Sequence, residues 1–210
     1  MIAGAPPVRL LQVATARARR SVGPNNLTTL SITLLKGLRI IAEVYMSDPD
    51  ASLQPYVRQA TEHQRLAYTG GHELAVILDA AITGGQLSVF DTHSRRGDAS
   101  PVHVHSRDDE AFLVLDGQMT VWVGQERHIL SAGGIAFLPR NIPHAVRCDI
   151  ATRALVLSAP AGSQETVFRT AGWDLSRPMP EGWQPAPDAL REAAEQAGVT
   201  LIGPPHGLDD

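Results

Sequence analysis

The chain has 210 residues, enough for one well-buried domain with appendages and too few for two full domains. Its hydrophobic content of 43% and charged content of 19% are ordinary for a soluble globular protein. Residues 1–45 carry six basic groups and one acidic group, whereas the remainder carries 12 basic and 21 acidic groups. An acidic body argues against nucleic acid as a partner, because neutralising phosphates requires clustered lysine and arginine.

The sequence gives no sign of a membrane span or a secretory signal. Its most apolar stretch, residues 31–46, is interrupted by Lys36 and Arg39, whereas a span requires ~18 consecutive apolar residues. We therefore expect no membrane partner and a cytoplasmic location. The single cysteine, Cys148, permits no intrachain disulfide. Arginine outnumbers lysine by 17 to 1, which is typical of a bacterium with a GC-rich genome.

Residues 1–45 differ in charge from the rest of the chain and are predicted to form an N-terminal extension. Apolar residues recur there at helical spacing, which predicts a short amphipathic helix through Leu34, Leu38, Ile41 and Tyr45. Two interpretations of the segment stay open. It packs loosely on the main domain, or it results from an upstream start codon, with Met46 as the native first residue.

Residues 46–170 are predicted to form the main domain with its lead-in. From residue 64 to residue 159, short β-prone runs alternate with glycine-containing turns, which indicates an all-β sandwich or barrel. Asp116-Gly117 lies between two apolar runs and predicts a tight hairpin. Together these signals predict an all-β domain of antiparallel strands.

Residues 163–172 are predicted to form a short helix. Residues 171–210 are predicted to form a proline-rich and helical tail. Within it, a helix is expected to begin with Asp188 at or near its N-cap and to end at Gly198.

Three histidines and one glutamate are the candidate metal ligands. His103 and His105 are two residues apart, so on a strand they project to one side, roughly 6.6 Å from each other. Glu110 can return to the same region from the next strand, and His144 lies on a later strand. Three imidazoles and one carboxylate suit one divalent transition metal per chain, namely Fe(II), Mn, Ni, Co, Cu or Zn, and are too nitrogen-rich for Ca or Mg.

Two segments resemble the sequence motifs of the cupin superfamily. The first is Gly97-x5-His103-x-His105-x4-Glu110-x6-Gly117, with every fixed position filled. The second is Gly133-x5-Pro139-x-Asn141-x2-His144-x3-Cys148, with two departures. The resemblance covers about residues 64–160. It implies a single cupin β-barrel (a double-stranded β-helix or jelly roll) with an N-terminal extension and a short C-terminal helical segment.

The two departures have physical interpretations. Asn141 replaces a turn glycine, and asparagine tolerates the left-handed backbone that such a turn requires. Cys148 replaces an asparagine and lies roughly 13 Å beyond His144 along the strand, too far to share its metal. We expect Cys148 to be a small buried hydrophobe, with a thiol that lines the pocket as the alternative.

Within the cupins, the chain is similar to bacterial single-domain proteins of the quercetin dioxygenase-like group. This resemblance implies an oxidoreductase that uses O2 to cleave a flavonol-like aromatic hydroxy-carbonyl substrate, releasing carbon monoxide. It also implies that His103, His105 and His144 hold the metal, and that Glu110 is a ligand or the general base. The alternatives are a metal-dependent cyclase or oxygenase of polyketide-like metabolites, and a non-catalytic small-molecule-binding cupin. A homodimer is expected, because barrel edges and an apolar N-terminal segment are exposed.

Strand parity also predicts which side chains form the substrate pocket and which do not. The expected apolar lining is Phe112, Val114, Ile135, Phe137 and Val146. Asp108 and Asp109 are expected in a solvated turn. Asp91 and His93 are expected to have a hydrogen-bonded structural role, with a position at the mouth of the cavity as the alternative. The remaining histidines are expected at the surface or in turns: His63, His72, His128 and His206.

Overall fold

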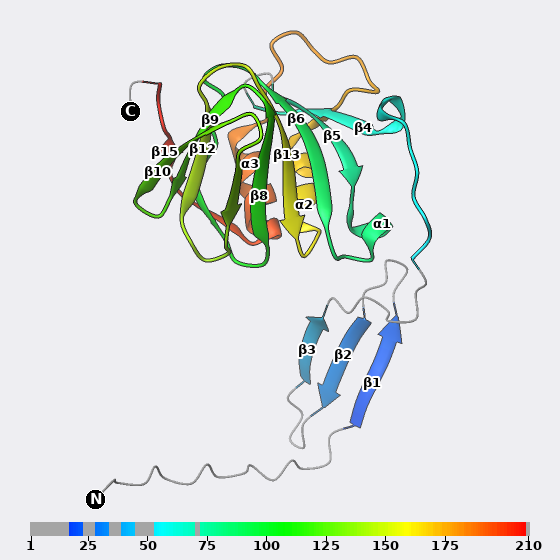
Figure 1. Cartoon of the computed structure of the whole chain (residues 1–210). Helices are drawn as coiled ribbons and strands as arrows, with labels where there is room; N and C mark the ends of the chain where they lie inside the picture. Colours follow the sequence, from blue (N-terminus) through cyan, green and yellow to red (C-terminus); the bar gives the residue numbers. More distant parts are fainter. Residues whose placement is uncertain (1–16, 23–27, 34–38, 45–52, 70–71, 209–210) are drawn as a thin grey trace, which may run out of the picture. The chain divides into compact units, whose positions relative to one another are not determined.

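The computed structural model describes residues 17–22, 28–33, 39–44, 53–69 and 72–208 (Figure 1). The chain divides into two compact units, Met1–Ser52 and Leu53–Asp210. In the part of the chain that the structure describes, no helix is long and apolar enough to cross a membrane.

The first unit contains a three-stranded antiparallel sheet in the order β1-β2-β3, formed by Arg17–Val22, Thr28–Thr33 and Arg39–Val44. The helix predicted through Leu38 and Ile41 is therefore wrong for residues 39–44. Two adjacent isoleucines, Ile40 and Ile41, lie in β3, and their branched side chains favour a strand over a helix. Leu34, Leu38 and Tyr45 lie outside the described residues.

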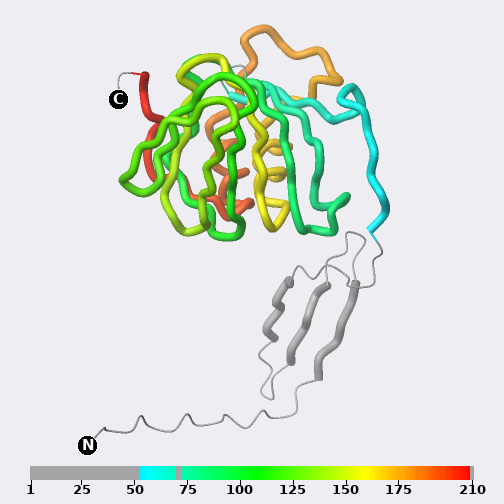
Figure 2. The backbone as a smooth tube through the Cα atoms, viewed as in Figure 1, coloured from blue at the N-terminus to red at the C-terminus, as the bar shows by residue number. Residues whose placement is uncertain are grey.

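The second unit is built of two antiparallel sheets, and its backbone path is shown in Figure 2. The five-stranded sheet has the order β10-β9-β12-β7-β15, formed by Glu126–Ser131, Gln118–Val123, His144–Cys148, Pro101–His105 and Val199–Pro205. The seven-stranded sheet has the order β11-β8-β13-β6-β5-β4-β14, formed by Ile135–Leu138, Asp109–Asp116, Thr152–Ala159, Ser88–Ser94, Glu73–Leu78, Gln64–Ala67 and Trp173–Asp174. The all-β jelly roll expected from the sequence is confirmed, as a two-sheet sandwich that does not close into one continuous barrel.

The core lies between the two sheets and follows from alternation along each strand. On β8, Phe112 and Val114 are buried at 8% and 0% exposure, while the intervening Leu113 is half-buried on the opposite face. Phe90 of β6 and Val121 of β9 are fully buried in the same apolar cluster. The inward face of β8 therefore belongs to the core, and Glu110 lies on that same face.

Helices and connections complete the unit. The helices are α1 (Ala80–Thr83), α2 (Ser163–Ala171) and α3 (Pro187–Ala197), together with a short 3-10 turn, Ala60–Glu62. Helix α2 matches the helix predicted over residues 163–172. The end of α3 at Gly198 is also as predicted, since Gly198 adopts a left-handed backbone and donates to Ala194 and Glu195. Ala186 is the N-cap, and Asp188 lies near it in the first turn, as predicted.

Two turns have backbone conformations that restrict the residue type they accept. Asp116-Gly117 does not close a hairpin as predicted, because β8 and β9 belong to different sheets and the turn carries the chain from one sheet to the other. Gly117 has φ of 88°, and a Cβ there would lie 2.3 Å from the carbonyl oxygen of Ala151, so only glycine fits. Asn141 has φ of 66°, which confirms the left-handed backbone expected there.

Candidate metal centre

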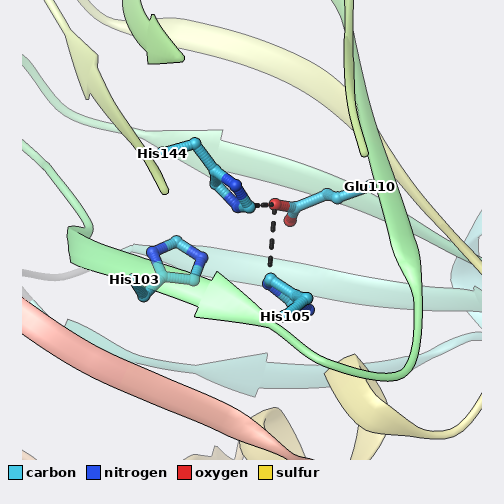
Figure 3. Close-up of side chains that lie close together, drawn as sticks. All are labelled: His103, His105, Glu110 and His144. Atoms are coloured by element: carbon cyan, nitrogen blue, oxygen red, sulfur yellow. Dashed lines mark hydrogen bonds and ion pairs between the residues drawn. The ribbon is translucent and has the colours of Figure 1, made fainter. Parts of the chain in front are cut away.

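The four predicted ligands converge between the two sheets (Figure 3). His103 and His105 lie two residues apart on β7, and His144 of β12 is directly opposite His103 in the antiparallel register. Glu110 reaches them from β8 of the other sheet. One ligand atom from each of the four residues lies within 4.8 Å of all the others. The set could therefore hold one metal ion between the two sheets.

Each imidazole is held through its Nδ1 atom, which leaves Nε2 for a metal. Nδ1 of His103 lies 2.8 Å from the carbonyl oxygen of Pro101, and Nδ1 of His144 lies 2.9 Å from that of Ile142. Nδ1 of His105 lies 3.1 Å from both carboxylate oxygens of Asp108. An acceptor at Nδ1 fixes the tautomer with its lone pair on Nε2, the arrangement found around metal-bound histidines.

The contacts of Nε2 fit a cation at the centre of the cluster. Nε2 of His144 lies 3.2 Å from Oε2 of Glu110, and Nε2 of His105 lies 3.8 Å from the same oxygen. Nε2 of His105 is buried and, among the described residues, has no hydrogen-bond partner. A buried polar atom without a partner costs about 1–3 kcal/mol, and coordination to a metal would remove this cost.

Burial and neighbouring charge set the protonation of the cluster. Burial lowers the pKa of His103 to about 4, although the charge of Glu110 acts in the opposite direction. Burial also acts to lower the pKa of His105. The hydrogen bond to Asp108 and the charges of Glu110 and Asp108 outweigh this effect, so the pKa of His105 is raised overall. Glu110 is buried, which disfavours its anion, yet its hydrogen bond with His144 and the surrounding imidazoles hold its pKa below the usual value.

Asp108 was expected in a solvated turn, and this expectation is wrong. The side chain of Asp108 is 1% exposed and hydrogen-bonds to His105. Asp109 is partly exposed and forms a paired hydrogen bond with Arg140, Nε to Oδ1 at 3.0 Å and Nη2 to Oδ2 at 2.9 Å. Adjacent aspartates therefore have separate roles, since one orients a candidate ligand and the other fixes the start of β8.

The structure also brings a residue to the cluster that the sequence did not indicate. Gln164, on the first turn of α2, is 6% exposed and donates from its side-chain amide to Oε1 of Glu110. It lies outside both sequence motifs, so no motif spacing could have indicated it.

A cavity of about 310 Å³ adjoins the candidate ligands and is mostly apolar. Phe112 and Val146 line it, as expected. The C-terminal segment contributes a wall that the sequence did not predict, formed by Leu190, Ala194, Val199, Leu201 and Pro205. This segment reaches the site because β15 pairs with β7, the strand that carries two of the histidines. The cavity is at the lower end of the size range of small-molecule sites.

The other three predicted lining residues lie elsewhere. Val114 is fully buried in the core. Ile135 and Phe137 are 63% and 64% exposed on β11. They lie on the outer face of the seven-stranded sheet, since the residue between them, Ala136, is the one that packs against the core. The prediction failed because β11 is apolar on both faces, so composition did not distinguish inside from outside.

The sequence also predicts roles for Cys148 and Asp91, and both residues are buried or half-buried. Cys148 is 5% exposed, packs in the core cluster and lines the cavity, and burial raises the pKa of its thiol. Both interpretations of Cys148 therefore hold. Asp91 accepts from Nε and Nη2 of Arg153 at 2.9 and 2.7 Å, as its predicted structural role requires.

The histidines expected at the surface or in turns differ from one another. His128 is exposed as predicted, and His63 is half-buried. His206 stacks on Trp122 with ring centroids 4.1 Å apart. His72 lines the cavity, and burial lowers its pKa to about 4. His72 hydrogen-bonds with Tyr68 and Thr69 in the turn between β4 and β5, as expected, although it also lines the cavity. His206 is half-buried in the segment after β15.

Known proteins resemble the part of the chain that contains this site. Residues 92–160 match the family described as "Cupin domain". The chain is 32% identical over 124 residues to quercetin 2,3-dioxygenase of Bacillus subtilis (strain 168). This alignment covers 59% of the chain and 36% of that relative, so the chain spans little more than a third of its length.

Two solved structures resemble the chain at lower sequence identity. KdgF from Halomonas sp. is 19% identical with a TM-score of 0.48, over 53% of this chain and 98% of that one. An RmlC-like cupin from Shewanella frigidimarina is 19% identical with a TM-score of 0.46, over 51% and 93%. The domain match and the relative from Bacillus subtilis both support the resemblance to the cupin superfamily. The matched residues 92–160 contain all four candidate ligands.

Proposed function

We propose that this protein is a metal-dependent dioxygenase that cleaves a flavonol-like or other small aromatic hydroxy-carbonyl substrate with O2. The observation that carries the proposal is the convergence of three buried or half-buried imidazoles and one buried carboxylate beside a mostly apolar cavity. The similarity to quercetin 2,3-dioxygenase supports the choice of chemistry.

The residues of the cluster have distinct roles in this proposal. His103, His105, His144 and Glu110 hold the metal, which when bound supplies Lewis acidity and the redox chemistry with O2. Alternatively, Glu110 leaves the metal and accepts the proton of the substrate hydroxyl through Oε2, the oxygen that faces the centre of the cluster. Phe112 and Val146 contact the flat apolar part of the substrate and exclude water.

Oxygen uptake with quercetin tests the proposal. The protein is loaded separately with Fe(II), Mn, Co and Ni, and bound metal per chain is measured for each sample. Metal-free protein is the control. We expect uptake accompanied by carbon monoxide release from at least one metallated form. No uptake from any fully metallated form would contradict flavonol cleavage and favour a cyclase, another oxygenase or a binding role.

We also propose that the protein is a homodimer through the outer face of the seven-stranded sheet. Ile135 and Phe137 project from this face, and their neighbours across the strands, Leu113 and Ala111 of β8, are apolar as well. Leu155 of β13 continues the patch beside Leu113. Ile135 and Phe137 are exposed and the other three are half-buried, and an apolar patch of this kind is typical of an interface.

Charge placed in this patch is expected to separate the copies. Ile135→Asp should convert a dimer to a monomer in sedimentation velocity at micromolar concentration, because it buries an unpaired carboxylate in the interface. Ile129→Asp is the matched control, since Ile129 is similarly exposed, at 59%, but lies on β10 of the other sheet. A wild-type protein that sediments only as a monomer would contradict the proposal. Cytoplasmic location stays a prediction of the sequence.

A further inference from the structure

We propose that Gln164 is a positioning residue for the metal centre, one that holds Glu110 so that a single carboxylate oxygen, Oε2, is presented to the metal. This proposal rests on the metal centre proposed above but not on the identity of the substrate. Gln164 lies four residues beyond the segment that matches the cupin domain, on an element of its own.

The two oxygens of Glu110 have different environments. Oε1 accepts a hydrogen bond from the side-chain amide of Gln164. Oε2 lies 3.2 Å from Nε2 of His144 and 3.8 Å from Nε2 of His105. An ionised carboxylate only accepts hydrogen bonds, so the glutamine must present its NH2 group to Oε1. With Oε1 occupied, Oε2 is the oxygen available to a cation.

The position of Gln164 is fixed by the residue that follows it. Glu165 is 6% exposed, and its Oε1 accepts from Oγ of Ser88 at 2.5 Å and from the backbone N–H of Ala80 at 2.8 Å. These contacts attach the first turn of α2 to β6 and α1. One turn further along, Phe168 packs edge-on against Phe90 in the core. Gln164 is therefore held on a rigid element.

A neutral amide suits this role because it adds no charge to the cluster. It stabilises the carboxylate anion, whereas it cannot compete for the metal as a second carboxylate would. Partners of metal ligands that act in this way typically change metal affinity by about 10–100-fold when they are removed.

Metal binding to variants of the full chain tests this role. Gln164→Leu removes the amide at nearly constant size, and Gln164→Asn keeps an amide that is one methylene too short to reach Glu110. Thr166→Val is the matched control on the same helix, since within the described part of the chain its hydroxyl bonds only to the carbonyl oxygen of Gly162. The dissociation constant for Co(II) and the visible absorption spectrum of the Co(II)-loaded protein are measured, because the intensity of this spectrum depends on coordination number.

We expect both Gln164 variants to bind Co(II) about 10–100-fold more weakly than wild type, with an altered visible spectrum, and Thr166→Val to match wild type. Circular dichroism identifies a variant that does not fold. If one Gln164 variant fails to fold, the metal affinity of the other variant tests the role of Gln164. Affinity within twofold of wild type and an unchanged spectrum in a folded Gln164 variant would overturn the role of Gln164 alone. A wild-type protein that binds no Co(II) would overturn the metal centre itself.

Discussion

Glu110→Gln is expected to abolish turnover while leaving most of the metal bound. The three imidazoles keep their Nδ1 acceptors, so their Nε2 atoms still face the cluster. The new amide has the same size, and its oxygen can still accept from Gln164. It cannot take up a proton, however, and loss of a general base costs about 10²–10⁴-fold in rate.

Two assays on the same sample separate the roles of Glu110. Metal per chain is measured by elemental analysis and turnover by oxygen uptake. Glu126→Gln is the control, because the side chain of Glu126 is 80% exposed on β10 and pairs with His128 alone among the residues that the structure describes. Turnover at the wild-type rate in Glu110→Gln would discard the assignment of Glu110 as the base.

Asp108→Leu is expected to weaken metal binding by about 10–100-fold and to lower the free energy of unfolding by about 1–3 kcal/mol. The carboxylate of Asp108 is buried against Nδ1 of His105 and fixes the ring and its tautomer. Without it, Nδ1 loses a buried partner and the imidazole is free to turn. The pKa of His105 should also fall, because Asp108 contributes to raising it.

The neighbouring aspartate is a matched control for this substitution. Asp109→Asn weakens the pair with Arg140 at a site that is partly exposed, and it leaves His105 in contact with Asp108. We expect metal affinity in Asp109→Asn to stay within about twofold of wild type. Equal losses of affinity in the two variants, measured by titration with Co(II), would show that Asp108 acts on the fold and not on the ligand.

The sequence predicted the fold class and the four candidate ligands because both depend on local spacing. Alternation places His103 and His105 on one face of a strand, and the glycine-containing turns predict many short strands. The sequence could not predict which strands belong to which sheet. Asp116-Gly117 is typical of a hairpin, yet here it connects two sheets, because β8 pairs with β11 and β13 whereas β9 pairs with β10 and β12.

The residues that support the ligands were harder to predict. Asp108 has the composition of a solvated turn, and only tertiary burial makes it the partner of His105. Gln164 reaches Glu110 across 54 positions of sequence, through the packing of α2. Ile135 and Phe137 were predicted to face the cavity, but both faces of β8 and β11 carry apolar side chains. The sequence alone does not show which of the two faces is buried.

The most direct test of the metal centre is the amount of metal bound per chain. Wild-type protein and the double variant His103→Ala/His144→Ala are each incubated with excess Co(II), desalted and analysed for cobalt and protein. We expect close to one cobalt per chain in the wild type and far less in the variant, with both proteins folded by circular dichroism. One cobalt per chain in the variant, or none in the wild type, would contradict this expectation.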